Sequence, residues 1–275
     1  MAVNTIVTDL DDTLLDEDGR ISGFTMAVIG ECRAEGLRVI AASGRAQASM
    51  EPLVRQLNTG LPYIACNGAE LVNADHTLME TLLLPAAVAW EVCAFLEEQG
   101  CYVQAYTDRR FYYARECAPS RRYKKSSGME GVAVGDLRAF ITFDTPKLLA
   151  VDEPEKIARI YPLAKERFGD KGSFTISKPF FLEATPPGAT KGKALRRLAR
   201  KMGIRPEETV VFGDSLNDLS MLAYTDHSVA MGNARDEVKA AARYVCLPNG
   251  QDGMARFIQE KVLRGRLGGK GGKRG

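Results

Sequence analysis

The sequence lacks any long apolar run and has few of the residues that build thiolate or imidazole sites. No apolar stretch approaches the roughly 20 residues that a membrane-spanning helix needs, so we expect no membrane partner. The six cysteines are scattered without a C-x-x-C pair, which argues against a zinc site. The two histidines, His76 and His227, are too far in sequence from the acidic motifs to suggest a triad. The chemistry must therefore come from other side chains.

The two ends of the sequence carry further information. Residues 1–12 reach acidic side chains at once, without the basic and then apolar layout of a secretory signal, so we expect a cytoplasmic protein. Residues 264–275 hold five basic residues and no acid. We expect this Gly-rich tail to be flexible, as a solubilising or vestigial extension rather than a nucleic-acid site.

Short β-branched runs alternate with helical patterns at both ends of the chain. This rhythm predicts parallel βαβ units, whose chemistry lies beyond the carboxyl ends of the strands. The predicted strands cover residues 5–10, 37–42, 62–66, 209–212, 228–231 and 244–247, and the predicted helices cover 22–35, 46–57 and 191–202, with a last one starting near 252.

The middle of the chain has a different pattern. Paired strand-like runs alternate there with helices, which indicates an α+β module with an antiparallel sheet. We therefore predict an α/β fold with a discontinuous first domain, residues 1–84 and 186–263, and an inserted domain, residues 85–185.

Carboxylates gather directly after the first predicted strand, in the run Asp9-Leu10-Asp11-Asp12-Thr13. An extended backbone puts Asp9 and Asp11 on the same side. Three carboxylates within four residues repel one another unless a cation lies among them, and Mg²⁺ prefers such hard oxygen ligands. An acidic turn or a helix cap is the alternative interpretation.

Three more motifs follow predicted strand ends or open a helix. Ser43-Gly44-Arg45 offers a hydroxyl and backbone N–H groups that suit a phosphoryl oxygen, although Ser is also a common helix cap. Lys191-Gly192 places a cation at a helix start, against the helix dipole, although a solvated Lys is commoner. Gly213-Asp214-Ser215-Leu216-Asn217-Asp218 adds two carboxylates after a buried strand, where helix capping is the alternative.

These four motifs, in this order and with these spacings, resemble the haloacid dehalogenase superfamily. The sequence is most similar to its Cof-type sugar-phosphate phosphatases, which carry a large α/β cap between the second and third motifs. The matching stretches are DLDDTLL at 9–15, ASGR at 42–45, NGA at 67–69, KGKAL at 191–195, GDSLNDLSML at 213–222, AMGNA at 230–234 and NGQDG at 249–253.

The resemblance implies a Rossmann-like parallel-sheet core with an inserted α+β cap, and a phosphatase that uses Mg²⁺. Asp9 would attack phosphorus and form an aspartyl-phosphate. Asp11 would protonate the leaving alcohol and then take a proton from water, so its pKa should be raised relative to that of Asp9. The metal ligands would be the Asp9 and Asp214 carboxylates and the Asp11 carbonyl oxygen. The sequence does not distinguish Mg²⁺ from Mn²⁺.

The resemblance also implies supporting roles. Ser43 and Gly44 would bind a phosphoryl oxygen, and Lys191 would offset the charge gathered at the nucleophile. Asp218 would orient Lys191 or a metal-bound water. Asn217 would contact the phosphate or the metal. Thr13 and the backbone N–H groups of Leu10 and Asp11 are lesser candidates.

One segment of the predicted cap has an unusual composition. Residues 109–125, RRFYYARECAPSRRYKK, combine seven basic residues with four aromatic ones. They could contact a polyanionic or aromatic leaving group. We favour the alternative of a solvated edge strand and loop, because basic residues guard exposed strand edges.

The expected partner is a small phosphorylated metabolite, because a large cap restricts access to the site. We expect a monomer or a weak dimer, and no nucleic acid. A phosphomutase or phosphotransferase on the same fold is the first alternative. A non-catalytic regulator that binds a phosphometabolite is the second, although it would not need both Asp9 and Asp11.

Overall fold

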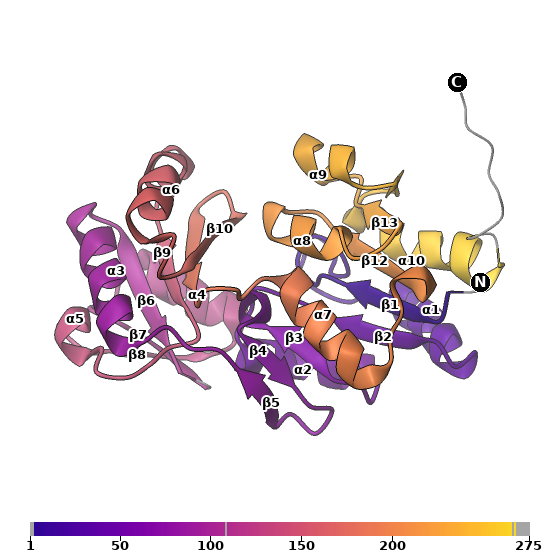
Figure 1. Cartoon of the computed structure of the whole chain (residues 1–275), viewed down its shortest axis with the longest axis horizontal. Helices are drawn as coiled ribbons and strands as arrows, with labels where there is room; N and C mark the ends of the chain where they lie inside the picture. The colour runs from indigo at the N-terminus through magenta and orange to yellow at the C-terminus, as the bar shows by residue number, and fades with distance from the viewer. Residues whose placement is uncertain (1–2, 108, 266, 268–275) are drawn as a thin grey trace.

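The computed structural model describes residues 3–107, 109–265 and 267, and it contains two lobes that lie side by side (Figure 1). We call the lobe with the parallel sheet the core. It is built from both ends of the chain, as the indigo and orange-to-yellow segments in Figure 1 show. We call the other lobe, with the six-stranded sheet, the cap. It is built from the middle of the chain, as the resemblance implied.

The core sheet has the strand order β14-β13-β12-β1-β2, and all neighbouring strands are parallel. β1 and β12 occupy inner positions and are buried throughout, as their β-branched sequences require of strands covered on both faces. The predicted parallel α/β fold is therefore confirmed. The strands are β1 (Thr5–Thr8), β2 (Arg38–Ala41), β12 (Thr209–Gly213), β13 (His227–Ala230) and β14 (Tyr244–Val245).

Helices surround the core sheet and bury one apolar side each. Hydroxyl groups fix where two of them begin, because the Ser22 hydroxyl accepts from the Thr25 N–H and the Thr190 hydroxyl accepts from the Lys193 N–H. The helices are α1 (Gly23–Ala34), α2 (Gln47–Leu57), α7 (Lys191–Met202), α8 (Leu219–Leu222), α9 (Asp236–Ala241) and α10 (Gly253–Phe257), which a π-helical segment (Ile258–Leu263) extends.

The third predicted strand pairs differently from expectation. β3 (Tyr63–Ala65) joins the end of the parallel sheet through an isolated parallel bridge between Ala42 and Ile64, next to which the Ser43 N–H donates to the Ile64 carbonyl oxygen. It pairs antiparallel with β4 (Glu70–Val72), which pairs with β5 (Leu78–Thr81) in a sheet of its own. The chain reverses within the short turn at Cys66–Gly68, so β4 pairs with β3 in place of a parallel neighbour.

The cap sheet has the order β10-β11-β9-β6-β7-β8 and is antiparallel except between β7 and β8. Its helices are α3 (Ala86–Glu98), α4 (Ala118–Ser127), α5 (Leu137–Phe140) and α6 (Pro154–Phe168). Its strands are β6 (Tyr102–Tyr106), β7 (Arg110–Tyr113), β8 (Glu130–Ala133), β9 (Leu148–Val151), β10 (Ser173–Lys178) and β11 (Phe181–Thr185).

Residues 109–125 do not form the solvated edge strand and loop that we favoured. β7 lies inside the sheet because β8, which the sequence did not reveal, pairs with it. The end of the segment forms α4, and Tyr123 of α4 is buried against Tyr106 and Phe111. The aromatic side chains of this segment therefore pack inward while several of its basic side chains remain exposed.

Three remaining predictions concern membrane-spanning helices, the cysteines and the basic tail. No helix in the described part of the chain is long and apolar enough to cross a membrane. The six cysteines are all free thiols, four of them buried. The predicted basic tail, residues 264–275, lies outside the described residues apart from Arg264, Gly265 and Leu267.

Candidate active site

The predicted motifs meet because three parallel strands end at the same edge of the core sheet. Thr8 at the end of β1 pairs with Ala41 of β2 and with Phe212 of β12. The residues that follow these strand ends, Asp9 among them, therefore emerge next to one another. This is the edge at which parallel α/β sheets carry their chemistry.

Lys191 lies between two buried carboxylates at this edge. Its Nζ atom is 2.6 Å from Asp9 Oδ1 and 2.7 Å from Asp218 Oδ1, although 182 positions separate Lys191 from Asp9 in the sequence. Gly192 makes this placement possible, because a Cβ atom there would collide with the carbonyl oxygen of Ser220. The structure thus brings three predicted residues into one ion-paired cluster.

Asp214 and Asp218 have different surroundings. Both oxygens of Asp218 are occupied, Oδ1 by Lys191 and Oδ2 by the N–H groups of Asp214 and Ser215, each at 3.0 Å. Asp214 Oδ1 accepts a hydrogen bond of 3.0 Å from the Thr13 hydroxyl. Asp218 therefore positions its neighbours, and Thr13 orients a carboxylate rather than facing the pocket.

This donor set fits a hard divalent cation. Oxygen atoms of Asp9, Asp214 and Asp218 lie within 4.8 Å of one another, and all three residues are buried. Because Asp218 is saturated, the second oxygens of Asp9 and Asp214 are the ones left to coordinate, as none of the described groups hydrogen-bonds to them. Carboxylate oxygens of this kind are the ligands that Mg²⁺ prefers.

Burial is the main cause of the pKa shifts of the two candidate metal ligands, Asp9 and Asp214. Desolvation raises the pKa of Asp9 well above its ordinary value, even though Lys191 opposes the shift. Desolvation, reinforced by the charge of Asp218, raises the pKa of Asp214 to about 7. The pKa of Lys191 is raised, because the charges of Asp218 and Asp9 outweigh the effect of its own burial. Without a cation, the site therefore favours protonated carboxyl groups.

Asp11 behaves opposite to the prediction that its pKa is raised relative to Asp9. Arg45 binds it in a bidentate pair, with Nε 2.7 Å from Oδ2 and Nη2 2.8 Å from Oδ1. Burial alone would raise the pKa of Asp11, but the hydrogen bonds and charge of Arg45 outweigh it and lower the pKa. Lys178 of the cap, 3.7 Å away, adds to this effect. The guanidinium had not been assigned a role from the sequence.

The loop after β2 forms the other side of the site. The buried Ser43 hydroxyl accepts a hydrogen bond of 3.1 Å from the Arg45 N–H. Asn217 donates to Asn67 Oδ1 at 2.9 Å, and two atoms of this pair, Asn67 Nδ2 and Asn217 Oδ1, are buried without a described partner. Polar groups without partners next to Ser43 suit a polar ligand.

Leu10 takes a structural position. Its side chain is fully buried, and its carbonyl oxygen accepts hydrogen bonds from the N–H groups of Leu14 and Leu15. It is not among the residues that line the pocket described next, and the contact of its backbone N–H with phosphate stays a prediction.

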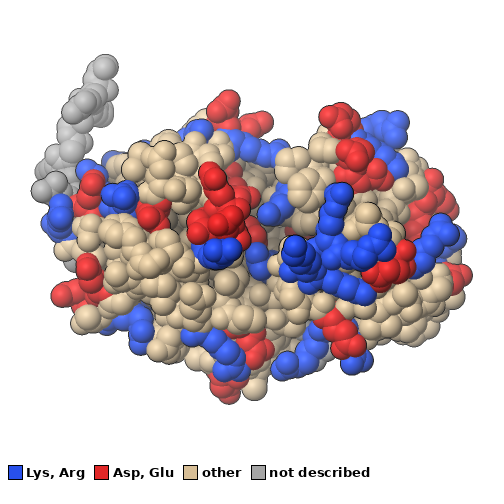
Figure 2. Space-filling model, turned by 180° about the vertical axis from the view of Figure 1, so that it is seen from behind, with Lys and Arg blue, Asp and Glu red and all other residues tan. Residues whose placement is uncertain are grey.

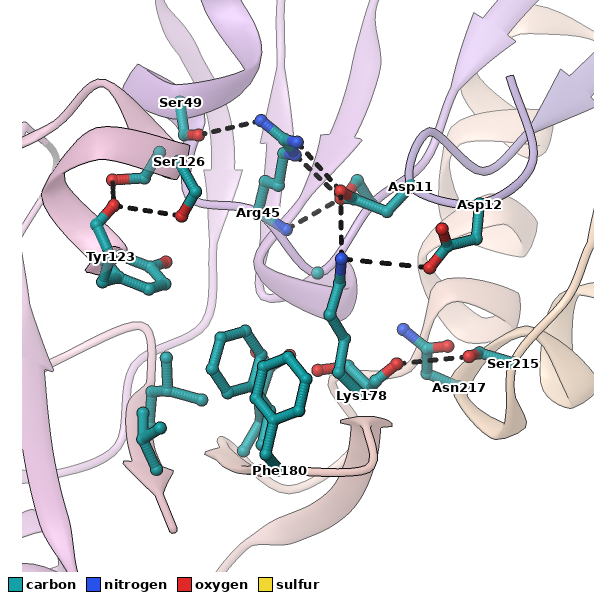
Figure 3. A pocket seen from close by; sticks show the side chains of 18 of the residues that line it. Asp11, Asp12, Arg45, Ser49, Tyr123, Ser126, Lys178, Phe180, Ser215 and Asn217 are labelled. Carbon is teal, nitrogen blue, oxygen red and sulfur yellow. Dashed lines mark hydrogen bonds and ion pairs between the residues drawn. The ribbon is translucent and has the colours of Figure 1, made fainter. Parts of the chain in front are cut away.

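A pocket of about 370 Å³ lies between the core and the cap. The core contributes Asp9, Asp11, Ser43 and Asp214 to its lining. The cap contributes residues from α4, β9 and the hairpin of β10 and β11, and Figure 3 shows Lys178 of this hairpin reaching Asp11. The Ser215 hydroxyl donates to the Ser177 carbonyl oxygen at 3.2 Å, which joins the hairpin to the core.

A buried ion pair forms a second link between the lobes. Lys147 of the cap donates to Glu183 Oε2 at 2.9 Å and to the Gly44 carbonyl oxygen at 2.8 Å. Gly44 is tightly surrounded, since a Cβ atom there would lie 3.1 Å from both the Glu183 carboxylate and Asn67 Oδ1. Gly44 therefore serves as the contact between the predicted phosphate loop and the cap.

Several residues of the pocket were not found from the sequence. Arg45 was visible in the ASGR stretch, where its role could have been suspected from its place beside Ser43. Arg122 and Tyr123 belong to residues 109–125, for which contact with a leaving group was the interpretation that we did not favour. The other cap residues carry no local signal, because they come from segments that are far apart in sequence. They are Lys147, Lys178, Phe180, Phe181 and Glu183.

Comparison with known proteins matches this geometry to one family. Residues 6–258 match the family model of the haloacid dehalogenase-like hydrolases. A haloacid dehalogenase-like hydrolase from Bacteroides thetaiotaomicron has a similar structure, with a TM-score of 0.83 and 29% sequence identity. The similarity covers 94% of this chain and 98% of that one.

Two named phosphatases are similar over their whole lengths. The 5-amino-6-(5-phospho-D-ribitylamino)uracil phosphatase YwtE of Bacillus subtilis is 28% identical, over 95% of this chain and 98% of its own. The pyridoxal phosphate phosphatase YbhA of Escherichia coli is 27% identical, over 96% of this chain and 100% of its own.

Proposed function

Since this chain belongs to the haloacid dehalogenase-like hydrolases, as a Cof-type phosphatase, we propose that it hydrolyses small phosphomonoesters through an aspartyl-phosphate on Asp9, with Mg²⁺ as its cofactor. The observation that carries this proposal is the contact of Lys191 with Asp218 and with Asp9, which lines the pocket between the core and the cap. A buried carboxylate next to a cation, with one oxygen facing the pocket, is placed to attack phosphorus.

The proposed reaction proceeds in two displacements. An oxygen of Asp9 forms a bond to phosphorus while the bond from phosphorus to the leaving oxygen breaks, and Asp11 gives that oxygen a proton. Asp11 then takes a proton from the water that attacks the aspartyl-phosphate, which releases inorganic phosphate and restores Asp9. Each step conserves charge and protons without a further reactant.

Asp11 must hold a proton before the first step, although Arg45 now lowers its pKa. A phosphoryl group carries its own negative charge, so it competes with Asp11 for the guanidinium. We propose that bound substrate draws Arg45 away and so lets Asp11 become protonated. Arg45 would then contact the phosphoryl oxygens together with Ser43.

The proposed Mg²⁺ ligands are the Asp9 and Asp214 carboxylates and the Asp11 carbonyl oxygen. When bound, the ion would offset the charge that the phosphate and Asp9 bring together. Lys191 offsets part of the same charge, and Asp218 holds both Lys191 and the backbone at Asp214 in place.

The small size of the pocket supports a metabolite as the substrate. A volume of about 370 Å³, closed on one side by the cap, admits a small molecule. The names of the two relatives point in the same direction, since each acts on a small phosphorylated compound.

Phosphate release by the Asp9→Asn variant tests the proposal. The substrates are a panel of sugar phosphates, nucleotides, pyridoxal phosphate and acetyl phosphate, each with Mg²⁺ and with EDTA. We expect Mg²⁺-dependent release by the wild type and a loss of at least about a thousandfold in the variant. Asp226→Asn, at an exposed aspartate, serves as the control. Release by folded Asp9→Asn protein at the wild-type rate would overturn the nucleophile assignment.

A further inference from the structure

The cap wall of the pocket carries three aromatic rings in series. Tyr123 and Phe181 lie 6.1 Å apart between ring centroids, at 62°, and Phe181 and Phe180 lie 4.6 Å apart, at 79°. All three line the pocket, and Leu149 and Val151 of β9 extend this apolar surface. Tyr123 comes from α4, whereas the two phenylalanines come from the β10–β11 hairpin, so two separate cap elements build one surface.

Phe180 is exposed where packing alone would bury it. Its side chain is 41% exposed, and it belongs to neither apolar cluster of the cap. Figure 3 shows its ring beside the space that Tyr123, Arg45 and Lys178 also border. An aromatic ring held at the edge of a pocket, with its partner ring fixed behind it, offers a face to a ligand.

Most polar groups of the same wall are already occupied, whereas Arg122, an exposed cation of α4, has no described partner. Lys147 and Glu183 bind each other, and Lys147 also binds the Gly44 carbonyl oxygen. The hydroxyls of Ser126 and Ser127 donate to the Tyr123 carbonyl oxygen. A leaving group with many hydroxyls would lose its hydrogen bonds to water at this wall and find few replacements.

The two ends of the pocket therefore suit different parts of a ligand. The core end, with Asp9, Arg45 and Lys178, suits the phosphoryl group. The cap end offers aromatic faces and aliphatic side chains, with Arg122 as its one charged side chain that has no described partner. A ligand that spans both ends needs a phosphate on one side and a flat apolar surface on the other.

We infer that Tyr123, Phe180 and Phe181 select phosphate esters whose alcohol carries a flat, unsaturated ring, in preference to those of sugars. This inference rests on the proposed phosphatase activity and specifies its substrate class. Stacking of a ring on an aromatic side chain is worth enough to change kcat/KM by about tenfold. Phe180, with its exposed face, is the specificity-determining residue in this account.

A matched pair of substrates tests the inference. Benzyl phosphate and cyclohexylmethyl phosphate share one skeleton and one phosphate position, and differ in whether the ring is flat. Glucose 6-phosphate adds a polar ring of similar size. The measured quantity is the ratio of kcat/KM between benzyl and cyclohexylmethyl phosphate, which does not depend on the amount of active protein.

We expect a ratio of about 5 or more for the wild type, and kcat/KM for glucose 6-phosphate below both. Phe180→Leu removes the ring and keeps an apolar side chain, so the ratio should fall toward 1. The control is Phe143→Leu, because Phe143 packs on Tyr112 and Phe140 in the cap, away from the pocket, and its loss should leave the ratio unchanged.

Two kinds of result would overturn the inference, and they can be told apart. Phosphate release from both substrates at equal kcat/KM, or a ratio that Phe180→Leu leaves intact, would contradict ring selection and leave the phosphatase proposal standing. No release from any substrate, acetyl phosphate included, would overturn the phosphatase proposal and the inference with it.

Discussion

At the scale of single residues, Asp9 and Asp11 show how neighbours decide protonation. Both are aspartates two positions apart, yet burial raises the pKa of Asp9 while Arg45 lowers that of Asp11. The proposed reaction needs the reverse, with an ionised Asp9 and a protonated Asp11. A cation at Asp9 and a phosphate at Arg45 would shift both groups in the required direction. Binding of the cation and the substrate would then set the protonation states of Asp9 and Asp11 that the reaction needs.

Asp214 gives a prediction about pH. Burial raises its pKa to about 7, whereas an unfolded aspartate titrates near 4. A raised pKa in the folded state means stability that is present at low pH and lost as pH rises through about 7. In EDTA, the Tm should therefore fall between about pH 4 and about pH 7 and change little from this group above that.

Mg²⁺ should reverse this trend, because the cation binds the ionised carboxylates. The rise in Tm on adding Mg²⁺ should grow over the same pH range, as measured by thermal unfolding with and without EDTA. Asp214→Asn should remove most of the rise, and the exposed Asp226→Asn should not. A Mg²⁺ effect that is independent of pH would contradict this role of Asp214.

Among single residues, those in sequence motifs could be predicted and those placed by the cap could not. Asp9, Lys191, Asp214 and Asp218 follow strand ends or open a helix, so the parallel fold brings them together. Lys178 belongs to a hairpin whose position over the core depends on the docking of the cap, and no local pattern reveals that. The roles of all these residues remain predictions that the proposed variants test.

At the scale of elements, β9 and β11 of the cap hold the buried pair Lys147 and Glu183 against the core loop at Gly44. Removing one partner leaves the other buried charge without an ion-pair partner. Lys147→Met should therefore lower the free energy of unfolding by about 3–5 kcal/mol, and the double variant Lys147→Met/Glu183→Leu should recover most of that loss. Urea unfolding of the wild type, both single variants and the double variant measures this coupling.

The exposed pair of Lys171 and Glu91 offers a matched comparison, since its side chains are 41% and 43% exposed. Lys171→Met should lower the free energy of unfolding far less than Lys147→Met does, because water screens an exposed pair. If Lys147→Met costs no more than Lys171→Met, the buried pair does not hold the cap elements in place.

The core elements were predictable because their buried, β-branched strands have a clear pattern. In the cap, three elements were not predicted, namely α4, β8 and α5. β8 and α4 were missed because residues 109–133 mix basic and aromatic side chains, and only the packing of Tyr123 on Phe111 shows which side of α4 is inside. β3 was placed in the parallel sheet because a three-residue strand carries no signal of its partner. The boundaries at residues 84 and 185 stay predictions.

At the scale of the whole molecule, the pocket exists only because the two lobes meet. Three contacts join them beside the site: Ser215 with Ser177, Lys178 with Asp11 and Asp12, and Lys147 with Gly44. Figure 2 shows Lys and Arg side chains gathering on the half of one face that holds the cap. Positive charge near the boundary favours the approach of phosphorylated molecules.

The covalent phosphate on Asp9 is the central claim, and trapping it is the most direct test. The enzyme is quenched in acid during turnover of its best substrate, treated with borohydride, and digested for mass spectrometry. We predict that the peptide containing residue 9 carries homoserine in place of Asp9, because borohydride reduces an aspartyl-phosphate. An unmodified residue 9 under steady turnover, or homoserine at Asp11 or Asp214 instead, would contradict the account.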